Sequence, residues 1–246
     1  MASFQLLTLN NPKILKGEKY GFLSVGLHLA PHRLSGHNVC PMASKGCSTG
    51  CLNTSGHGRY SRTQNARIRK TRFFFENREG FGNALIADIR AAQRKAAREH
   101  KGCVVRLNLT SDIQYENIQF GGKTIFEHFP DVQFMDYTKI PTRFFKPLPA
   151  NYHLTFSRSE SNAAQAEMLS ALGHNVAVVF DTPKGCKLPS KYLGRKVIDG
   201  TKHDLRFLDK KGVFVGLRAL GRAMNDKTGF VVKVYNIALD SNPQKH

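Results

Sequence analysis

The sequence feature that most constrains the fold is a series of short apolar segments, separated by stretches long enough for a loop or a helix. These segments lie at residues 20–30, 103–110, 132–138, 152–157, 175–182, 196–199 and 213–219. Two connecting stretches, residues 81–102 and 161–175, have the character of helices and a glycine stop, at Gly102 and Gly173. Strands joined by helix-length connections are typical of a parallel sheet.

The length of the chain narrows the architecture further. Its 246 residues are enough for one domain with one substantial core. About seven strands without a dinucleotide-binding glycine motif predict a single α/β domain over residues 1–246, a TIM-like (β/α) barrel that is irregular or incomplete. An open doubly wound sheet is the alternative. No apolar run is long enough to span a membrane, and the first residues lack a secretory signal, so we expect a cytoplasmic protein.

Three of the five cysteines lie close together in the segment VCPMASKGCSTGCLNTSGHG, residues 39–58. Cys40, Cys47 and Cys51 have the spacing C-x6-C-x3-C, and Gly46 and Gly50 precede the last two. A cytoplasmic setting and an odd cysteine count disfavour disulfides. Thiolates are soft ligands that suit zinc or an iron–sulfur cluster, so we expect a metal or a cluster in this loop.

The identity of the metal remains open at this point. A structural zinc site needs four ligands, and His57 is the predicted fourth, with His37 and Cys103 as alternatives. Three thiolates with one open position would instead suit a cluster that binds a substrate or cofactor. The spacing matches neither the common zinc pairs nor the motif of most radical S-adenosylmethionine enzymes.

The charge of the chain favours a polyanionic partner. Lys and Arg total 37 against 18 acidic residues, which gives a net charge of +19. Nucleic acid is the first candidate for such a partner. The densest basic stretch, within the segment 32–78 that also holds the cysteine loop, follows the cysteines directly. Its predicted phosphate contacts are Arg59, Arg62, Arg67, Arg69, Lys70 and Arg72.

Polar side chains follow several of the apolar segments. In a parallel α/β sheet, reactive groups lie beyond the carboxyl ends of the strands, where the cysteine loop is also expected. Asp112 and Asp136 are the candidate catalytic residues because burying a carboxylate at such an edge requires partners. The candidate substrate-binding residues are Asn108, Ser111, Lys139 and Ser157.

Several segments together resemble a bacteriophage family known only by a numbered gene product. They include NVCPMASKGCSTGCLNTSGHG, ARIRKTRFF, VRLNLTSDIQYE and VIDGTKHDLRFLD, and the resemblance covers roughly residues 20 to 235. More distantly, the chain is similar to phage-type DNA-guanine transglycosylases, which replace guanine with a 7-deazaguanine. That likeness implies a barrel related to the queuine tRNA transglycosylases, with one Asp as nucleophile and another for base recognition, roles for which Asp112 and Asp136 are the candidates in either order.

These observations predict a phage DNA-modifying enzyme in the host cytoplasm, with DNA and a 7-deazaguanine base as its partners. The nucleophile would hold a covalent glycosyl intermediate while the bases exchange, with the target base out of the stack. The tRNA enzymes hold zinc late in the chain and this sequence has its cysteines early, so their zinc site is not carried over. The alternatives are a radical-type iron–sulfur enzyme, with its cluster on Cys40, Cys47 and Cys51, and a non-enzymatic phage DNA-binding protein.

Overall fold

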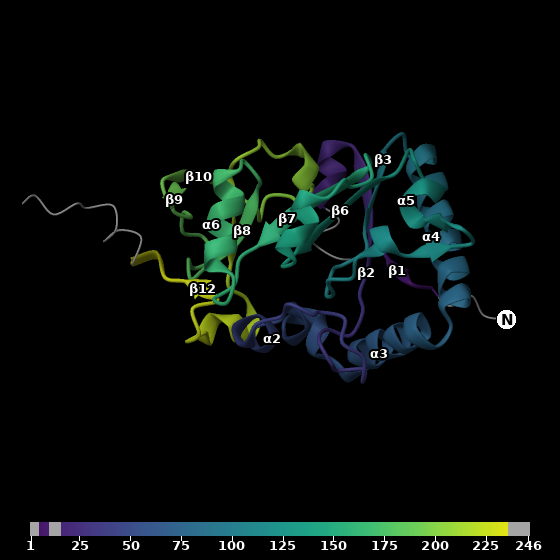
Figure 1. The fold of residues 1–246 in the computed structure, drawn as a ribbon, viewed down its shortest axis with the longest axis horizontal. Coiled ribbons are helices and arrows are strands. Elements are labelled where there is room, and N and C mark those ends of the chain that lie inside the picture. Colours follow the sequence, from purple (N-terminus) through teal and green to yellow (C-terminus); the bar gives the residue numbers. More distant parts are fainter. Residues whose placement is uncertain (1–4, 10–15, 236–246) are drawn as a thin grey trace, which may run out of the picture.

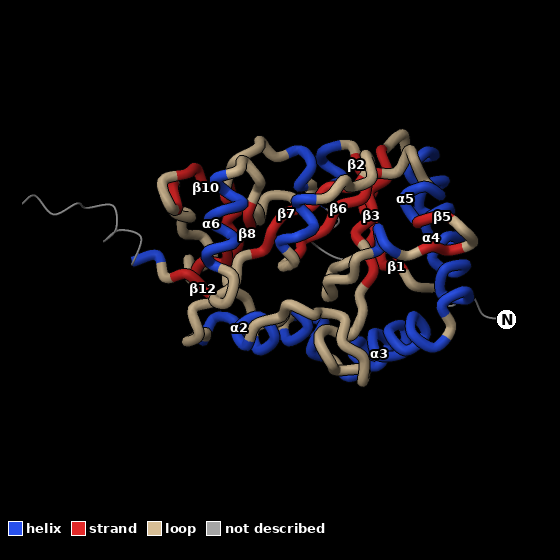
Figure 2. The backbone as a smooth tube through the Cα atoms, in the orientation of Figure 1, coloured by secondary structure: helices blue, strands red, loops and turns tan. Residues whose placement is uncertain are grey.

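The computed structural model describes residues 5–9 and 16–235, and its centre is one mostly parallel β-sheet (Figures 1 and 2). Each of the seven apolar segments contains one parallel strand. In chain order these are β2 (Phe22–Leu27), β3 (Gly102–Arg106), β6 (Gln133–Thr138), β7 (Tyr152–Ser157), β8 (Val176–Phe180), β10 (Arg195–Asp199) and β11 (Phe214–Arg218).

The predicted TIM-like barrel, irregular or incomplete, is wrong, because the sheet is an open path. Its order is β1-β2-β3-β6-β7-β8-β11-β10-β9, and β12 (Val231–Val232) pairs with β8. At one end β1 (Leu7–Thr8) runs antiparallel to β2, and at the other β9 (Lys191–Tyr192) runs antiparallel to β10. These short strands occupy the two edges that would have to pair to close a barrel. Strands β2 to β8 follow one another in chain order, without the central reversal of a doubly wound sheet.

Three longer helices pack beside the sheet. They are α3 (Ser61–Glu76), α4 (Arg78–Arg98) and α6 (Ala163–Ala171), and the last two overlap the predicted helical segments 81–102 and 161–175. Asn77 starts α4 by accepting the Gly80 backbone N–H at 2.8 Å. Phe81, Leu85 and Ile89 form its buried face in the core around β2 and β3. Among the described residues, no helix is long and apolar enough to cross a membrane.

Short helical turns and a small hairpin complete the described part of the chain. The short helices are α2 (Lys45–Thr49), α5 (Ile125–His128), η1 (Lys16–Tyr20), η2 (Leu52–Thr54), η3 (Gly56–Arg59), η4 (Tyr115–Asn117), η5 (Pro141–Phe145), η6 (Arg206–Leu208) and η7 (Gly221–Asn225), and the hairpin pairs β4 (Gln119–Phe120) with β5 (Lys123–Thr124). Helices α2 and α3 lie beyond one end of the strands, the lower end in Figure 1. The chain enters this region from the carboxyl end of β2, so the cysteine loop lies where parallel sheets place their functional sites.

Candidate functional site

The cysteine loop contains a one-turn helix and is held by a carboxylate from the loop that follows β7. Cys47 lies within α2, and the side chain of Ser44 caps the helix by accepting the Cys47 backbone N–H at 3.1 Å. Glu160, which follows β7, accepts the Gly46 N–H at 2.6 Å and the Ser44 hydroxyl at 2.7 Å. The loop after β7 therefore holds the cysteine loop in place.

The glycine beside Cys47 is required by close packing. A Cβ atom on Gly46 would lie 2.2 Å from the Thr228 hydroxyl and 2.5 Å from the Phe230 Cβ. Gly46 lies within the helical turn, and the absence of a side chain lets α2 press against the segment after η7.

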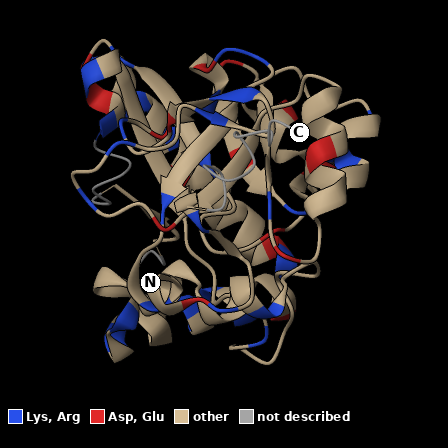
Figure 3. Ribbon diagram, turned by 90° about the vertical axis from the view of Figure 1, so that its left-hand side faces the viewer, with Lys and Arg blue, Asp and Glu red and all other residues tan. Residues whose placement is uncertain are grey.

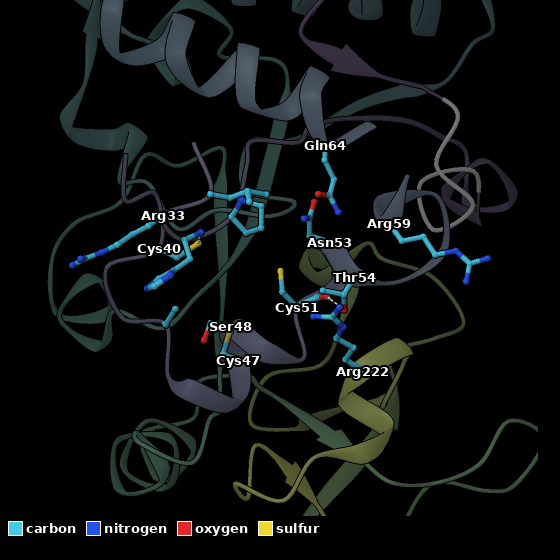
Figure 4. A pocket seen from close by; sticks show the side chains of 14 residues that line it. Arg33, Cys40, Cys47, Ser48, Cys51, Asn53, Thr54, Arg59, Gln64 and Arg222 are labelled. Atoms are coloured by element: carbon cyan, nitrogen blue, oxygen red, sulfur yellow. Dashed lines mark hydrogen bonds between the residues drawn. The ribbon is translucent and has the colours of Figure 1, made fainter. Parts of the chain in front are cut away.

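Cys40, Cys47 and Cys51 all line one cavity of about 490 Å³ (Figure 4). Arg33, Arg59 and Arg222 also line it, and among the described residues no Asp or Glu does. Figure 4 shows the guanidinium of Arg59 turned outward from the thiols, with Arg33 on the side of Cys40. The cavity therefore combines three thiols with a cationic rim.

The environment of two of the thiols, Cys40 and Cys51, favours their protonated form. Burial raises the pKa of Cys40 to about 12 and also raises the pKa of Cys51, and each thiolate would repel its cysteine neighbours. Backbone N–H groups nevertheless point at both sulfurs: the His32 N–H donates to the Cys40 sulfur at 3.4 Å, and the Asn53 N–H donates to Cys51. Such donors stabilise thiolates, so a cation that displaces the protons would meet a prepared site.

A buried arginine lies beside this site. Arg67 is only 9% exposed, and its guanidinium donates to the side chain of Asn53. Its Nε has no hydrogen-bond partner, and none of the ion pairs among the described residues includes it. Burial lowers its pKa, whereas the nearby Cys51 raises it. A buried cation without a carboxylate is costly, so a negative charge at Cys51 would stabilise Arg67.

Three of the four predicted metal ligands line the cavity, and the fourth does not. Across residues 5–9 and 16–235, no group of three or more His, Cys, Asp or Glu side chains is placed to hold one. His57, the predicted fourth zinc ligand, is exposed against Tyr60 and is absent from the cavity wall, which includes His32 instead. Of the alternatives, His37 stacks on Phe75 and Cys103 is buried in the core.

The two candidate catalytic carboxylates lie outside the cavity wall, and Asp112 is the one near the cysteine loop. The Cys40 thiol donates to the Thr110 carbonyl at 3.7 Å, so the loop that carries Asp112 reaches the same edge of the sheet. Asp112 pairs with Arg143 at 3.3 Å and accepts the Lys139 backbone N–H at 2.8 Å. Burial raises its pKa.

Asp136 is more deeply buried, at 1% exposure. It accepts the Asn108 backbone N–H at 2.8 Å and the Tyr152 hydroxyl at 3.0 Å. Burial raises the pKa of Asp136 to about 6, although Arg106 opposes that shift. Both carboxylates are thus engaged by the protein itself.

The predicted substrate-binding residues also contact one another. The Ser111 hydroxyl donates to the Asn108 side-chain oxygen at 2.8 Å, which ties the loop after β3. The Lys139 ammonium donates to the Ser157 hydroxyl at 2.7 Å and lies 5.7 Å from the centre of the Phe230 ring. None of these four residues lines the cavity.

The six predicted DNA-binding residues divide into two groups. Arg59, Arg62, Arg69 and Arg72 are exposed. Arg67 points into the interior, and the Lys70 ammonium donates to the Leu6 carbonyl at 2.5 Å. Only the first group is available to a partner.

Comparison with known proteins gives one match. A family model described as Gene product 88 matches residues 5–234. No curated protein and no solved structure matches the chain. The predicted resemblance to a bacteriophage gene-product family is thereby confirmed, whereas no match supports the more distant likeness to transglycosylases.

Proposed function

The chain belongs to the Gene product 88 family, and we propose that it is an iron–sulfur enzyme whose cluster is held by Cys40, Cys47 and Cys51. This is the radical-type alternative that the sequence left open. The observation that carries the proposal is the convergence of three thiols on one cavity beside the buried, carboxylate-free Arg67.

The spread of the thiols favours a cluster over zinc. A single ion draws its ligands to one centre, whereas each thiolate of a cluster binds a different iron, which spaces the ligands farther apart. The described residues offer no tight group for one ion, yet the three thiols share a cavity wall. That arrangement suits an iron–sulfur cluster, which is larger than a single zinc ion.

The electrostatics agree with this choice. Three thiolates bring negative charge to the side of Arg67, and the backbone donors of His32 and Asn53 supply hydrogen bonds to two of the sulfurs. Hydrogen bonds to the sulfurs and the polarity around a cluster tune its reduction potential.

Three protein ligands leave one iron of a four-iron cluster without a side chain. A cluster held by these three cysteines would supply one-electron chemistry to a ligand in the cavity. The protein's own residues would hold the thiolates, balance their charge and confine the ligand. Arg33, Arg59 and Arg222 would favour a ligand that carries negative charge.

The test is anaerobic purification or reconstitution, followed by iron, sulfide and zinc analysis and electron paramagnetic resonance after reduction. We expect a brown protein with iron and sulfide, and loss of most of the iron in each of Cys40→Ser, Cys47→Ser and Cys51→Ser. Cys186→Ser is the matched control because Cys186 is exposed and outside the cavity. A colourless protein with stoichiometric zinc, or equal iron in all four variants, would overturn the proposal.

Base exchange through Asp112 and Asp136 stays a prediction. No observation at the cavity favours it, because neither carboxylate lines the wall and each already has close partners. Its direct test is given in the Discussion.

A further inference from the structure

We propose that the substrate of this cavity is a single strand of nucleic acid, which lies along the exposed face of α3 and places one nucleotide in the cavity. The inference rests on the proposed function for the role of that nucleotide, but its binding surface is argued independently.

The first support is a stripe of unpaired arginines on α3. Arg62, Arg69 and Arg72 are exposed, and none takes part in an ion pair among the described residues. Ten residues separate the first from the last, a rise of about 15 Å along the helix. Figure 3 shows Lys and Arg recurring in the lower layer that contains this helix. A stripe of this length can contact several phosphates of one strand.

Exposed aromatic rings lie at both ends of the stripe. Tyr60 is 52% exposed immediately before α3, and Phe75 is 37% exposed in its last turn. The His37 ring stacks on Phe75 with a centroid distance of 4.2 Å and an interplanar angle of 9°. Unpaired bases stack on such rings, whereas a duplex keeps its bases inside. The aromatic rings therefore favour a single strand over a duplex or another polyanion.

The stripe continues into the cavity. Arg59 lies just before α3 and also lines the cavity, and Arg222 adds a second guanidinium from η7. The cavity's volume of about 490 Å³ lies within the usual range for small-ligand sites, so it can admit a nucleoside. A nucleic-acid strand that follows the stripe towards the start of α3 would therefore meet Arg59 at the cavity wall.

Binding is tested by fluorescence anisotropy with a labelled oligothymidylate, as a single strand and annealed to its complement, over a series of salt concentrations. The variant R62Q/R69Q/R72Q removes the stripe. The matched control is R90Q/R94Q/R98Q, which removes three exposed arginines from α4, also without ion pairs among the described residues. We expect the stripe variant to lower the salt slope by about 2, at about 0.7 for each lost phosphate contact.

The aromatic contribution has a separate signature. Tyr60→Leu with Phe75→Leu should weaken single-strand binding at least about five-fold, the low end for one lost stacking contact, and leave the salt slope unchanged. Equal loss in the α4 control, or tighter binding of the duplex than of the single strand, would overturn the inference.

Entry into the cavity is tested by thiol labelling of cluster-free protein with N-ethylmaleimide, mapped by mass spectrometry. The single strand should slow labelling of Cys47 and Cys51 several-fold and leave Cys186 unchanged, because Cys186 is exposed elsewhere. Equal labelling with and without the strand would contradict cavity entry.

The failures of the two proposals are distinguishable. A strand that binds and protects the thiols in a protein that never takes up a cluster would reject the iron–sulfur proposal and leave the binding surface standing, as the non-enzymatic alternative requires. A protein that holds the cluster but binds no strand would reject only the present inference.

Discussion

Glu160 accepts a hydrogen bond from the backbone N–H of Gly46 at 2.6 Å, across 114 residues of sequence. Its second carboxylate oxygen accepts the hydroxyl of Ser44, which itself caps α2 and thereby orients Cys47. The position of the second thiol therefore depends on a carboxylate beyond the carboxyl end of β7, a strand in the middle of the sheet.

Glu160→Ala should destabilise the protein by about 2 kcal/mol, because two hydrogen bonds to a charged group are lost. It should also speed the loss of iron on exposure to air, since α2 is no longer fixed. Urea denaturation and iron analysis over time measure the two effects. Glu167→Ala is the control, because Glu167 is exposed on α6. Identical iron loss in the two variants would show that Glu160 does not position the thiols.

Arg67→Met should act differently on the cluster-bound and cluster-free forms. In a cluster-bound protein the guanidinium would balance the thiolates, so its removal would be costly. In the cluster-free protein the same change removes a buried cation that has no carboxylate partner, which offsets the lost bond to Asn53. We expect the variant to lower the stability of the cluster-bound form by at least about 1 kcal/mol more than that of the cluster-free form.

Anaerobic urea denaturation of both forms measures that difference. Arg69→Met, an exposed change on the same helix, should shift both forms equally. If Arg67→Met changes the stability by the same amount with and without the cluster, Arg67 does not balance the charge of the thiolates.

Asp112→Asn and Asp136→Asn test base exchange directly. If either carboxylate is the nucleophile, its variant should incorporate no labelled 7-deazaguanine into DNA while the wild type does. Because both side chains are buried and paired, circular dichroism must show that each variant is folded before its activity is interpreted. Full incorporation by both folded variants would end the assignment.

The strands were predictable because their signal is local. Each buried strand is an apolar run, and Phe81, Leu85 and Ile89 repeat at the helical period in α4. The open shape of the sheet was not predictable in the same way. It depends on β1 and β9, which are two residues long and carry too little pattern to be recognised as edge strands.

The candidate site was also only partly predictable from the sequence. The three thiols were predicted to act together because twelve residues of chain contain them all. Arg222 and Glu160 join the site from more than 100 residues away, and spacing along the chain holds no information about that contact. The carboxylates were predicted to be reactive because each follows an apolar segment, and the sequence could not show that partners from other segments, such as Arg143 and Tyr152, engage them.

Asp136 also predicts a pH dependence of stability. Burial raises its pKa from 3.8 to about 6, so between these values the folded protein keeps a proton that the unfolded chain has lost. The folded state then binds more protons than the unfolded state, and stability falls as pH rises through this window. The stability that protonated Asp136 contributes is fully present below pH 3.8 and is lost above about pH 6. At about 1.4 kcal/mol for each unit of pKa, the loss is about 3 kcal/mol.

Asp136→Asn cannot ionise and should lack this loss, so its stability relative to the wild type should increase from pH 4 to pH 7 by about 2 kcal/mol. Comparing the two proteins cancels Asp209, whose pKa burial also raises to about 6. The remaining difference in stability measures the ionisation of Asp136 alone, a group whose pKa is lowered by two nearby cations, Arg106 and Arg143. Urea midpoints measured across this range give the result, and a constant difference between the two proteins would mean that Asp136 is already ionised in the folded state at pH 4.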